Sequence, residues 1–211
     1  MIRWGIIAPG GIANAFAKEV IKTKDGVLSA VYGRNEDKTK ELAKENNVFI
    51  MEALWTLFLP AINQAKAWIE EGKIGKVKLI TANFGFKSEC NLNSRLYNPN
   101  LAGGALLDVG IYPILFSNYI ANSYPKEIKA SAEFTKTNVD ESNIINLKYE
   151  DGALASLTCS IAVDTDNTAI IYGEKGKIVI QRFWAAKEAY LYTEDTTEKY
   201  IDEYEEAGIQ V

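Results

Sequence analysis

The N-terminal stretch IRWGIIAPGGIANAFAKEV joins a short apolar run to an amphipathic pattern through a turn with two consecutive glycines. Ile2–Ile7 is typical of a buried strand, and Ile12, Phe16 and Val20 recur at helical spacing after the turn. Val27–Tyr32 is a second apolar run. A strand, a glycine turn, a helix and a strand in this order predict the first half of a doubly wound α/β domain.

The rest of the chain has a different pattern, in which short alternating runs follow one another from Val77 onward. The candidate strands are residues 77–86, 126–135, 142–150, 152–161, 168–174, 176–181 and 188–193, and the candidate hairpin turns are Asp151-Gly152 and Glu174-Lys175-Gly176. Pro60 opens a helical pattern before these runs, and a second helical pattern covers residues 103–122. Runs of strands with few helices favour an antiparallel sheet that has its helices on one face. We therefore predict an α/β domain over residues 1–59 and an α+β domain over residues 60–211.

The composition excludes several classes of function. The chain has no histidine, which removes Ser-His-Asp hydrolases and nearly all catalytic zinc sites, so we predict no metal site. A net charge of −5 disfavours nucleic acid and anionic membranes as partners, and no apolar run approaches the ~20 residues of a bilayer span. Cys90 and Cys159 are too few for a disulfide framework. The scarcity of cysteines fits a reducing compartment, and we therefore expect a cytoplasmic protein. With nucleic acid and membranes disfavoured, we expect a small-molecule substrate.

The glycine turn resembles a dinucleotide-binding fingerprint, in which glycines allow a tight turn and close approach of a pyrophosphate. Gly10 fills the second glycine position and Ala13 the third, whereas Ala8 replaces the first glycine. Phosphates bind at helix N-termini because the free N–H groups and the helix dipole favour anions. A purely structural turn between strand and helix is the alternative interpretation.

The end of the second strand indicates which cofactor such a site would take. An NAD-selective site places an Asp or Glu here, and Tyr32-Gly33-Arg34-Asn35 has neither. Arg34 can instead pair with a 2′-phosphate and stack on adenine, which predicts NADP with NAD as a possibility. The alternative is a solvated surface arginine.

The stretch LAGGALLDVGIYP carries the second group of candidate residues. Asp108 and Tyr112 are four residues apart, so both project from one face of a helix, and Pro113 is expected to kink that helix. A carboxylate beside a phenol can orient a substrate hydroxyl and move its proton. Alternatively, Asp108 only stabilises a helix start and Tyr112 belongs to the core.

Aromatic residues occur in pairs that are candidates for lining a pocket for a ring-shaped substrate. The pairs are Trp55/Phe58, Phe84/Phe86 and Phe183/Trp184. Burial in the core is the alternative for each of them.

Several long segments in order resemble the Gfo/Idh/MocA oxidoreductases, in particular their dihydrodiol dehydrogenase-like branch. They are IRWGIIAPGGIANAFAKEV, FIMEALWTLFLPAI, IGKVKLITANFGF, SRLYNPNLAGGALLDVGIYP and IYGEKGKIVIQRFW. The resemblance implies NAD(P)-dependent hydride transfer at a ring carbon of a sugar or cyclic diol. It also implies a Rossmann domain followed by an open-faced antiparallel sheet that often forms a homodimer interface.

The resemblance further implies a role for individual residues. Asp108 matches the acid of the family, and Tyr112 stands where many members have histidine, a substitution typical of this branch. The implied catalytic residues are therefore Asp108 and Tyr112. The implied cofactor-binding residues are Ala8, Pro9, Gly10, Gly11, Ile12, Ala13, Arg34, Asn35 and Trp55.

The sequence also departs from the family pattern. It contains no Glu-Lys-Pro, the motif whose lysine is the main catalytic group of the family, and Leu57 replaces an arginine usual in the branch. In relatives, the second half of the Rossmann domain holds two central strands, and a chain that truly lacked them would have an unpaired sheet edge. We therefore expect that this half and the C-terminal end are missing from this sequence. The alternative is a truly shortened, non-catalytic member that acts as a dimerising or ligand-binding protein.

Overall fold

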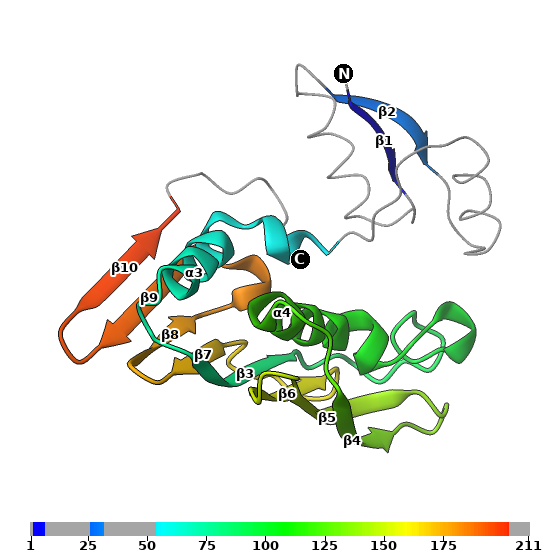
Figure 1. The fold of residues 1–211 in the computed structure, drawn as a ribbon. Coiled ribbons are helices and arrows are strands. Elements are labelled where there is room, and N and C mark those ends of the chain that lie inside the picture. Colours follow the sequence, from blue (N-terminus) through cyan, green and yellow to red (C-terminus); the bar gives the residue numbers. More distant parts are fainter. Residues whose placement is uncertain (1, 7–25, 32–53, 203–211) are drawn as a thin grey trace. The chain divides into compact units, whose positions relative to one another are not determined.

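A computed structural model of the chain describes residues 2–6, 26–31 and 54–202. The chain divides into two compact units (Figure 1). The first unit comprises Met1–Ala53 together with Glu203–Val211, and the second comprises Leu54–Asp202.

The first unit contains two paired strands, β1 (Ile2–Ile6) and β2 (Gly26–Val31). They run parallel, which is the pairing that a strand–helix–strand unit requires. Most of the predicted cofactor residues lie outside the described residues, and their roles stay predictions. These residues are Ala8, Pro9, Gly10, Gly11, Ile12, Ala13, Arg34 and Asn35.

The second unit is built on one eight-stranded sheet with the order β10-β9-β8-β7-β3-β6-β5-β4. Its strands are β3 (Val77–Gly85), β4 (Glu127–Phe134), β5 (Asp140–Lys148), β6 (Leu154–Ser160), β7 (Ala169–Gly173), β8 (Gly176–Ile180), β9 (Glu188–Thr193) and β10 (Thr197–Ile201).

The sheet is mixed, which corrects the expectation of a purely antiparallel one. Strand β3 pairs in parallel with β6, whereas every other neighbouring pair in this sheet is antiparallel. The parallel pair arises because the chain leaves β3 through a helix and the β4–β5 hairpin before β6 fills the place beside β3. A connection through a helix returns the chain in the direction of the strand that it left.

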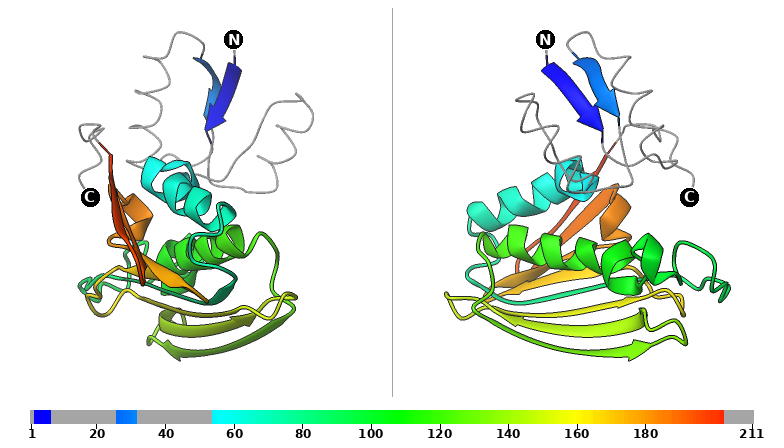
Figure 2. Two further views of the ribbon diagram at one scale, coloured as in Figure 1. Left: turned by 60° about the vertical axis from the view of Figure 1, so that its left-hand side comes forward. Right: turned by 90° about the vertical axis from the view of Figure 1, so that its right-hand side faces the viewer.

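Two helices cover one face of this sheet, as Figure 2 shows. Helix α3 (Pro60–Glu70) lies against β8 and β9, and α4 (Ile111–Ala121) lies against β3 and β6. The large residues that are fully buried between the two layers include Ile62, Ile80, Phe116, Leu157, Ile171 and Ile178. The α+β arrangement with helices on one face agrees with the expectation for this part of the chain.

Short helical turns complete the second unit. They are η1 (Trp55–Phe58), η2 (Pro99–Leu101), η3 (Leu106–Gly110) and η4 (Phe183–Ala185). The element η3 is a single turn of π-helix, which we call the π-turn.

The second face of the sheet carries no helix of the described unit (Figure 2). Strand β3 shows the alternation clearly: Ile80, Ala82 and Phe84 are buried under the helices, whereas Leu79 on the other face is 36% exposed. Ile144 of β5 is 54% exposed on this same face. We call this surface the open face.

Strand β10 is the strand that alternation in the sequence did not single out. It is an edge strand that pairs only with β9, and its residues alternate between half-buried and exposed. Neither face of β10 is fully covered, so its residues need not alternate between apolar and polar. The sequence TEKYI therefore lacks the alternation that predicts a strand.

The stretch from Pro99 to Ala121 is long and apolar enough to span a membrane by length and composition, which corrects the expectation that no apolar run approaches this length. In the structure, Phe116, Ser117 and Ile120 of this stretch are buried in the second unit. The apolar character is explained by packing on the sheet, as in the core helix of a globular domain.

Candidate active site

The segment that carries Asp108 is fastened to β5 by a carboxylate. Asp140 Oδ2 accepts hydrogen bonds from the backbone N–H of Leu106 and from Asn143 Nδ2, each at 2.6 Å. Gly104 has a φ of 120°, and a side chain at this position would collide with the Asp140 carboxylate. The turn that follows is a π-turn, a form that occurs often at functional sites.

The far end of the π-turn rests directly on β6. A Cβ atom at Gly110 would lie 2.8 Å from Cys159 Sγ, so only glycine allows this approach. Cys159 is 2% exposed, and burial raises the pKa of its thiol to about 11. The thiol is therefore protonated near neutral pH and serves as packing surface rather than as a nucleophile.

Asp108 lies between these two anchors, with its side chain 16% exposed. Its carboxylate forms an ion pair and a hydrogen bond with the guanidinium of Arg95. Arg95 belongs to the loop before the π-turn, and its side chain is 64% exposed. The carboxylate is thus presented near the surface and held by one cation.

Tyr112 stands one turn further along, in the first turn of α4, and its ring continues into a series of aromatic contacts. The Tyr112 ring packs edge-on against Phe84 with centroids 5.3 Å apart, and Phe84 stacks on Trp184 at 4.9 Å. Trp184 in turn packs edge-on against Trp55 at 6.1 Å. We call Tyr112, Phe84, Trp184 and Trp55 the aromatic row.

The aromatic row takes one member from each aromatic pair singled out in the sequence. Phe183, the neighbour of Trp184, is instead fully buried in the core, and Phe58 is 64% exposed. Phe183 and Trp184 are adjacent residues of the short helix η4, so their side chains point in different directions.

A buried hydroxyl fixes the two tryptophans of the row relative to each other. Thr56 is 2% exposed and donates a hydrogen bond from Oγ1 to the carbonyl oxygen of Trp184 at 2.9 Å. The indole Nε1 of Trp184 is buried and has no acceptor among the described residues. The guanidinium of Arg182 lies over the indole, 5.5 Å from the ring centroid.

The structure thus places three predicted site residues, Asp108, Tyr112 and Trp55, in the second unit. Tyr112 and Trp55 are joined through the aromatic row, and Asp108 precedes Tyr112 by one turn. The turn at Asp108 is a π-turn rather than the α-helical turn assumed from the sequence. It lies just before Pro113, which has no N–H to donate to a carbonyl of the preceding turn.

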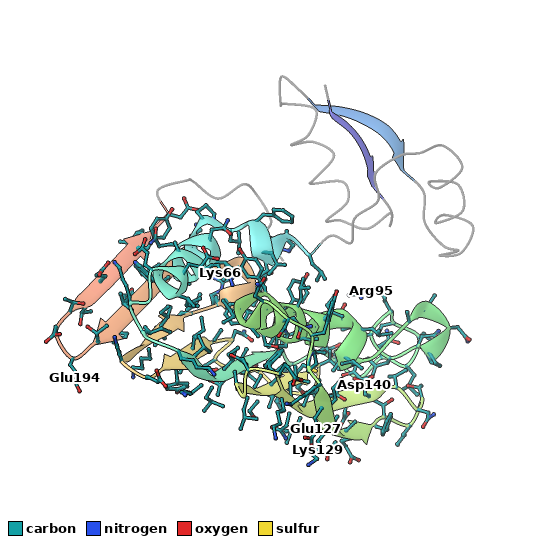
Figure 3. The ribbon with its side chains drawn as sticks, in the orientation of Figure 1. Lys66, Arg95, Glu127, Lys129, Asp140 and Glu194 are labelled. Carbon is teal, nitrogen blue, oxygen red and sulfur yellow. The ribbon has the colours of Figure 1, made fainter. Side chains whose placement is uncertain are left out.

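Arg95 and Asp140 are site residues that the sequence analysis did not single out. Both are distant from Asp108 along the chain, and neither belongs to a periodic pattern. Figure 3 shows Arg95 and Asp140 at the opposite end of the second unit from Glu194. The available signal was the position of Arg95 within SRLYNP, the segment that directly precedes the glycines and the π-turn.

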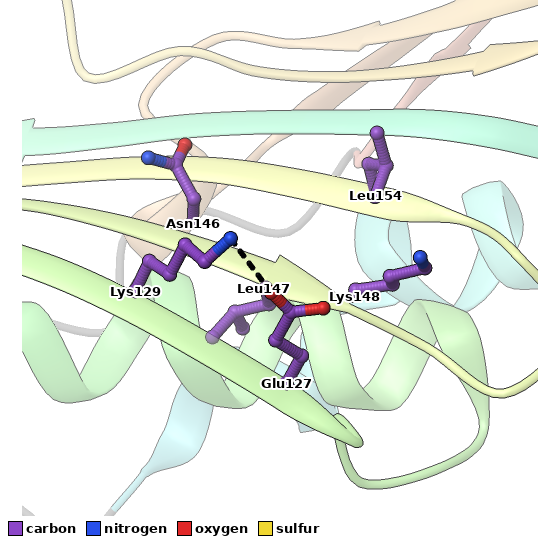
Figure 4. A pocket seen from close by; sticks show the side chains of 6 residues that line it. All are labelled: Glu127, Lys129, Asn146, Leu147, Lys148 and Leu154. Carbon is purple, nitrogen blue, oxygen red and sulfur yellow. Dashed lines mark ion pairs between the residues drawn. The ribbon is translucent and has the colours of Figure 1, made fainter.

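Two hollows occur on the described surface away from Asp108. One, of about 260 Å³, lies over β4, β5 and β6, where Glu127 and Lys129 form an ion pair at 2.8 Å (Figure 4). Their hydrogen bond lowers the pKa of Glu127 and raises that of Lys129. The other, of about 470 Å³, lies at the turn between β9 and β10. The described residues contain no group of three potential metal ligands.

The chain was compared with protein families and curated proteins. Residues 62–179 match the family model described as the GFO/IDH/MocA C-terminal domain. The trans-1,2-dihydrobenzene-1,2-diol dehydrogenase of Mus musculus is 36% identical over 160 residues, which cover 74% of this chain and 47% of that protein. The enzyme of the same name from Danio rerio is 38% identical over 139 residues, which cover 65% of this chain and 41% of that protein. The chain spans about half the length of the curated relatives that it matches.

Solved structures share the fold at low sequence identity. An aldose-aldose oxidoreductase from Caulobacter crescentus complexed with glycerol superimposes with a TM-score of 0.76 at 13% identity, covering 97% of this chain and 84% of that one. The 3-ketoreductase KijD10 from Actinomadura kijaniata, in complex with TDP-benzene and NADP, gives a TM-score of 0.72 at 17% identity and covers 95% and 84%. The family match, the identity to the curated relatives and the shared fold agree, and the chain belongs to the GFO/IDH/MocA family, in its dihydrodiol dehydrogenase-like branch.

Proposed function

We propose that the chain acts as an NADP-preferring oxidoreductase that transfers a hydride to or from a ring carbon of a cyclic diol or sugar. The observation that carries the proposal is the position of Asp108 and Tyr112 on consecutive turns, with Tyr112 at the end of the aromatic row. Aromatic rings bind the faces of cyclic substrates, while a few polar groups fix their orientation. The names of the curated relatives support the same class of reaction.

The cofactor part of the proposal rests on the parallel pairing of β1 and β2. Segments that follow the carboxyl ends of neighbouring parallel strands start at the same edge of a sheet, where nucleotides bind in α/β folds. Gly10 and Gly11 follow β1, and Arg34 follows β2. These residues fit a pyrophosphate and a 2′-phosphate, and a structure of one fold relative contains NADP. NADP, when bound, supplies the acceptor or donor of the hydride.

The remaining steps belong to the side chains of the second unit. The Asp108 carboxylate accepts a hydrogen bond from a substrate hydroxyl and so orients the carbon that bears it. Tyr112 exchanges the proton of that hydroxyl through its phenol oxygen, a role that general acid–base catalysis assigns to tyrosine in a chain without histidine. The half-buried members of the aromatic row, Tyr112, Trp184 and Trp55, pack against the ring of the substrate and exclude water from it. The buried Phe84 supports them from the core.

Two measurements test this function. NADPH is titrated into the purified chain while its fluorescence is followed, and NADP-linked oxidation of trans-cyclohexane-1,2-diol and of D-xylose is assayed by absorbance. Tyr112→Phe removes only the phenol oxygen and is expected to lower kcat on the order of 10²-fold, the lower end of what a general acid or base contributes. Full turnover by Tyr112→Phe removes this residue from the mechanism.

The second candidate function is a non-catalytic, ligand-binding or dimerising member of the family. It is favoured by one observation, the absence of Glu-Lys-Pro from the sequence. Binding of NADPH or of a diol without any turnover supports this second function over the first.

We also propose that the chain forms a homodimer through the open face in a reducing, cytoplasmic setting. The open face exposes Leu79, Ile144 and Leu154 beside polar and charged side chains, among them the Glu127–Lys129 ion pair, which is the mixed character of a subunit interface. The free thiols of Cys90 and Cys159 are consistent with a reducing compartment.

A further inference from the structure

Arg95 is a cation that the proposed reaction does not yet use, although it contacts Asp108 directly. Its side chain is 64% exposed, and an ion pair with one such exposed partner contributes little to stability. Within residues 54–202, Arg95 is the one side chain that pairs with the Asp108 carboxylate. The ion pair therefore contributes more to the orientation of the Asp108 carboxylate than to the stability of the fold.

The backbone around Arg95 is built to reach Asp108. The carbonyl oxygens of Arg95 and Leu96 would lie 2.9 and 2.8 Å from a Cβ atom at position 103, so the loop can fold this closely only over glycine. The backbone N–H of Gly104 then donates to the Leu96 carbonyl at 2.9 Å. Two glycines thus bring the loop against the start of the segment that carries Asp108.

Tyr97 anchors the same loop in the core, two residues after Arg95. Its side chain is 2% exposed, and its hydroxyl shares a hydrogen bond with Ser88 Oγ at 2.9 Å. Its carbonyl oxygen accepts a hydrogen bond from Thr137 Oγ1 at 2.5 Å. The guanidinium of Arg95 therefore extends from a backbone that is anchored at the next two residues, Leu96 and Tyr97.

We propose that Arg95 is a positioning residue, which holds Oδ1 of Asp108 so that Oδ2 remains directed to a substrate hydroxyl. This rests on the proposed function, in which Asp108 accepts that hydroxyl. A carboxylate turns easily about its terminal torsion, and Asp140 restrains only the backbone of the π-turn. Among the residues that the structure describes, Arg95 supplies the side-chain restraint on the Asp108 carboxylate.

The test compares three variants of the full chain. Arg95→Met keeps an unbranched apolar side chain and removes the charge and the donors, and Arg95→Lys keeps the charge but loses the planar guanidinium. The control is Lys78→Met, which breaks the similarly exposed Lys78–Glu174 ion pair at 2.7 Å. We expect Arg95→Met to lower kcat/KM for the diol by about 10–100-fold, Arg95→Lys to retain an intermediate value and Lys78→Met to match wild type.

Added guanidinium chloride separates positioning from a merely structural role. At millimolar concentration it is expected to restore part of the activity of Arg95→Met and to leave wild type and Lys78→Met unchanged. Arg95→Met with wild-type kinetics overturns the proposal, and so does a loss of activity that guanidinium does not restore.

Calorimetric binding of trans-cyclohexane-1,2-diol and D-xylose in the presence of NADPH distinguishes failure of this inference from failure of the proposed function. If wild type binds a probe without turnover, the oxidoreductase function fails, and a tenfold weaker binding by Arg95→Met still supports positioning. In that case, equal affinity of wild type and Arg95→Met for the probe overturns the positioning role of Arg95. If wild type binds neither probe, both the proposed function and the role of Arg95 are overturned.

Discussion

Gly110 and Cys159 show how single residues without polar chemistry determine where the candidate acid lies. The absent side chain at Gly110 lets the π-turn rest on β6, and the buried thiol of Cys159 fills the space beneath it. Asp108 precedes Gly110 by two residues, so its height above the sheet is determined by this contact. A change of side-chain volume at such a contact affects stability because protein interiors are close-packed.

Gly110→Ala is predicted to destabilise the chain by about 1–3 kcal/mol, because its Cβ meets Cys159 Sγ at 2.8 Å. Urea denaturation measures the loss. Cys159→Ala in the same chain removes the sulfur and is expected to recover part of it. An additive double variant, with no recovery, contradicts the steric explanation.

Cys159 also predicts a dependence of stability on pH. Burial raises the pKa of the folded thiol from 9.0 to about 11, so the folded state keeps a proton that the unfolded chain releases. This contribution is complete below pH 9 and is lost as the pH rises toward 11. The loss amounts to about 3 kcal/mol for two pKa units.

Urea denaturation of wild type and Cys159→Ala at several pH values between 8 and 11 isolates the contribution of this thiol from that of the tyrosines. We expect the stability of wild type to fall more steeply than that of the variant across this range. Parallel curves for the two proteins contradict the assignment.

At the level of elements, the candidate site is a junction between a π-turn and the edge region of the sheet. Asp140 of β5 accepts two hydrogen bonds at 2.6 Å, one of which comes from the first residue of the π-turn. Thr56 joins η1 to η4 in the same manner by a single buried hydrogen bond. Each short element is therefore placed by a polar contact rather than by its own helix propensity.

Asp140→Asn is predicted to destabilise the chain by about 1–3 kcal/mol and to lower kcat more than it changes KM. The amide oxygen can take the place of Oδ2, which accepts both hydrogen bonds, but it carries no negative charge and accepts them more weakly. Asp164→Asn is the matched control, because Asp164 accepts a backbone hydrogen bond from Lys87 at 3.0 Å at an exposed position. Equal effects of the two variants on kcat contradict a specific role of Asp140.

At the level of the whole molecule, the open face distinguishes this architecture from a closed two-layer domain. Neighbouring strands β4 and β5 each carry an exposed isoleucine, Ile128 at 63% and Ile144 at 54%. Ile128 pairs with the buried Leu147, so it lies on the helix side, whereas Ile144 lies on the open face. The two residues therefore form a matched pair for a test of association.

Ile144→Lys is predicted to weaken self-association at least tenfold, because a lysine that replaces a buried isoleucine in the interface loses its hydration without gaining a partner. Ile128→Lys is expected to associate like wild type. Sedimentation equilibrium measures both variants. A monomeric wild type, or an Ile144→Lys variant as dimeric as wild type, contradicts the proposed interface.

The sequence predicted the elements of the second unit better than the contacts of the candidate site. Pro60 correctly marked the start of α3, and Asp151-Gly152 and Glu174-Lys175-Gly176 correctly marked two hairpin turns. These features depend on local backbone preferences that a short stretch already contains. The roles of Asp108 and Tyr112 stay predictions, which the Tyr112→Phe and Arg95→Met variants test.

Local patterns by themselves predicted both long helices and most strands of the second unit, with β10 as the exception, and the resemblance of several long segments predicted the family to which the chain belongs. The tertiary structure alone decided that β3 and β6 run parallel, that the turn at Asp108 is a π-turn and that Arg95 reaches Asp108. The physical reason is the range of the interactions. Periodicity and turn propensities act between residues a few positions apart, whereas strand order and the approach of Gly110 to Cys159 depend on residues that meet only after folding.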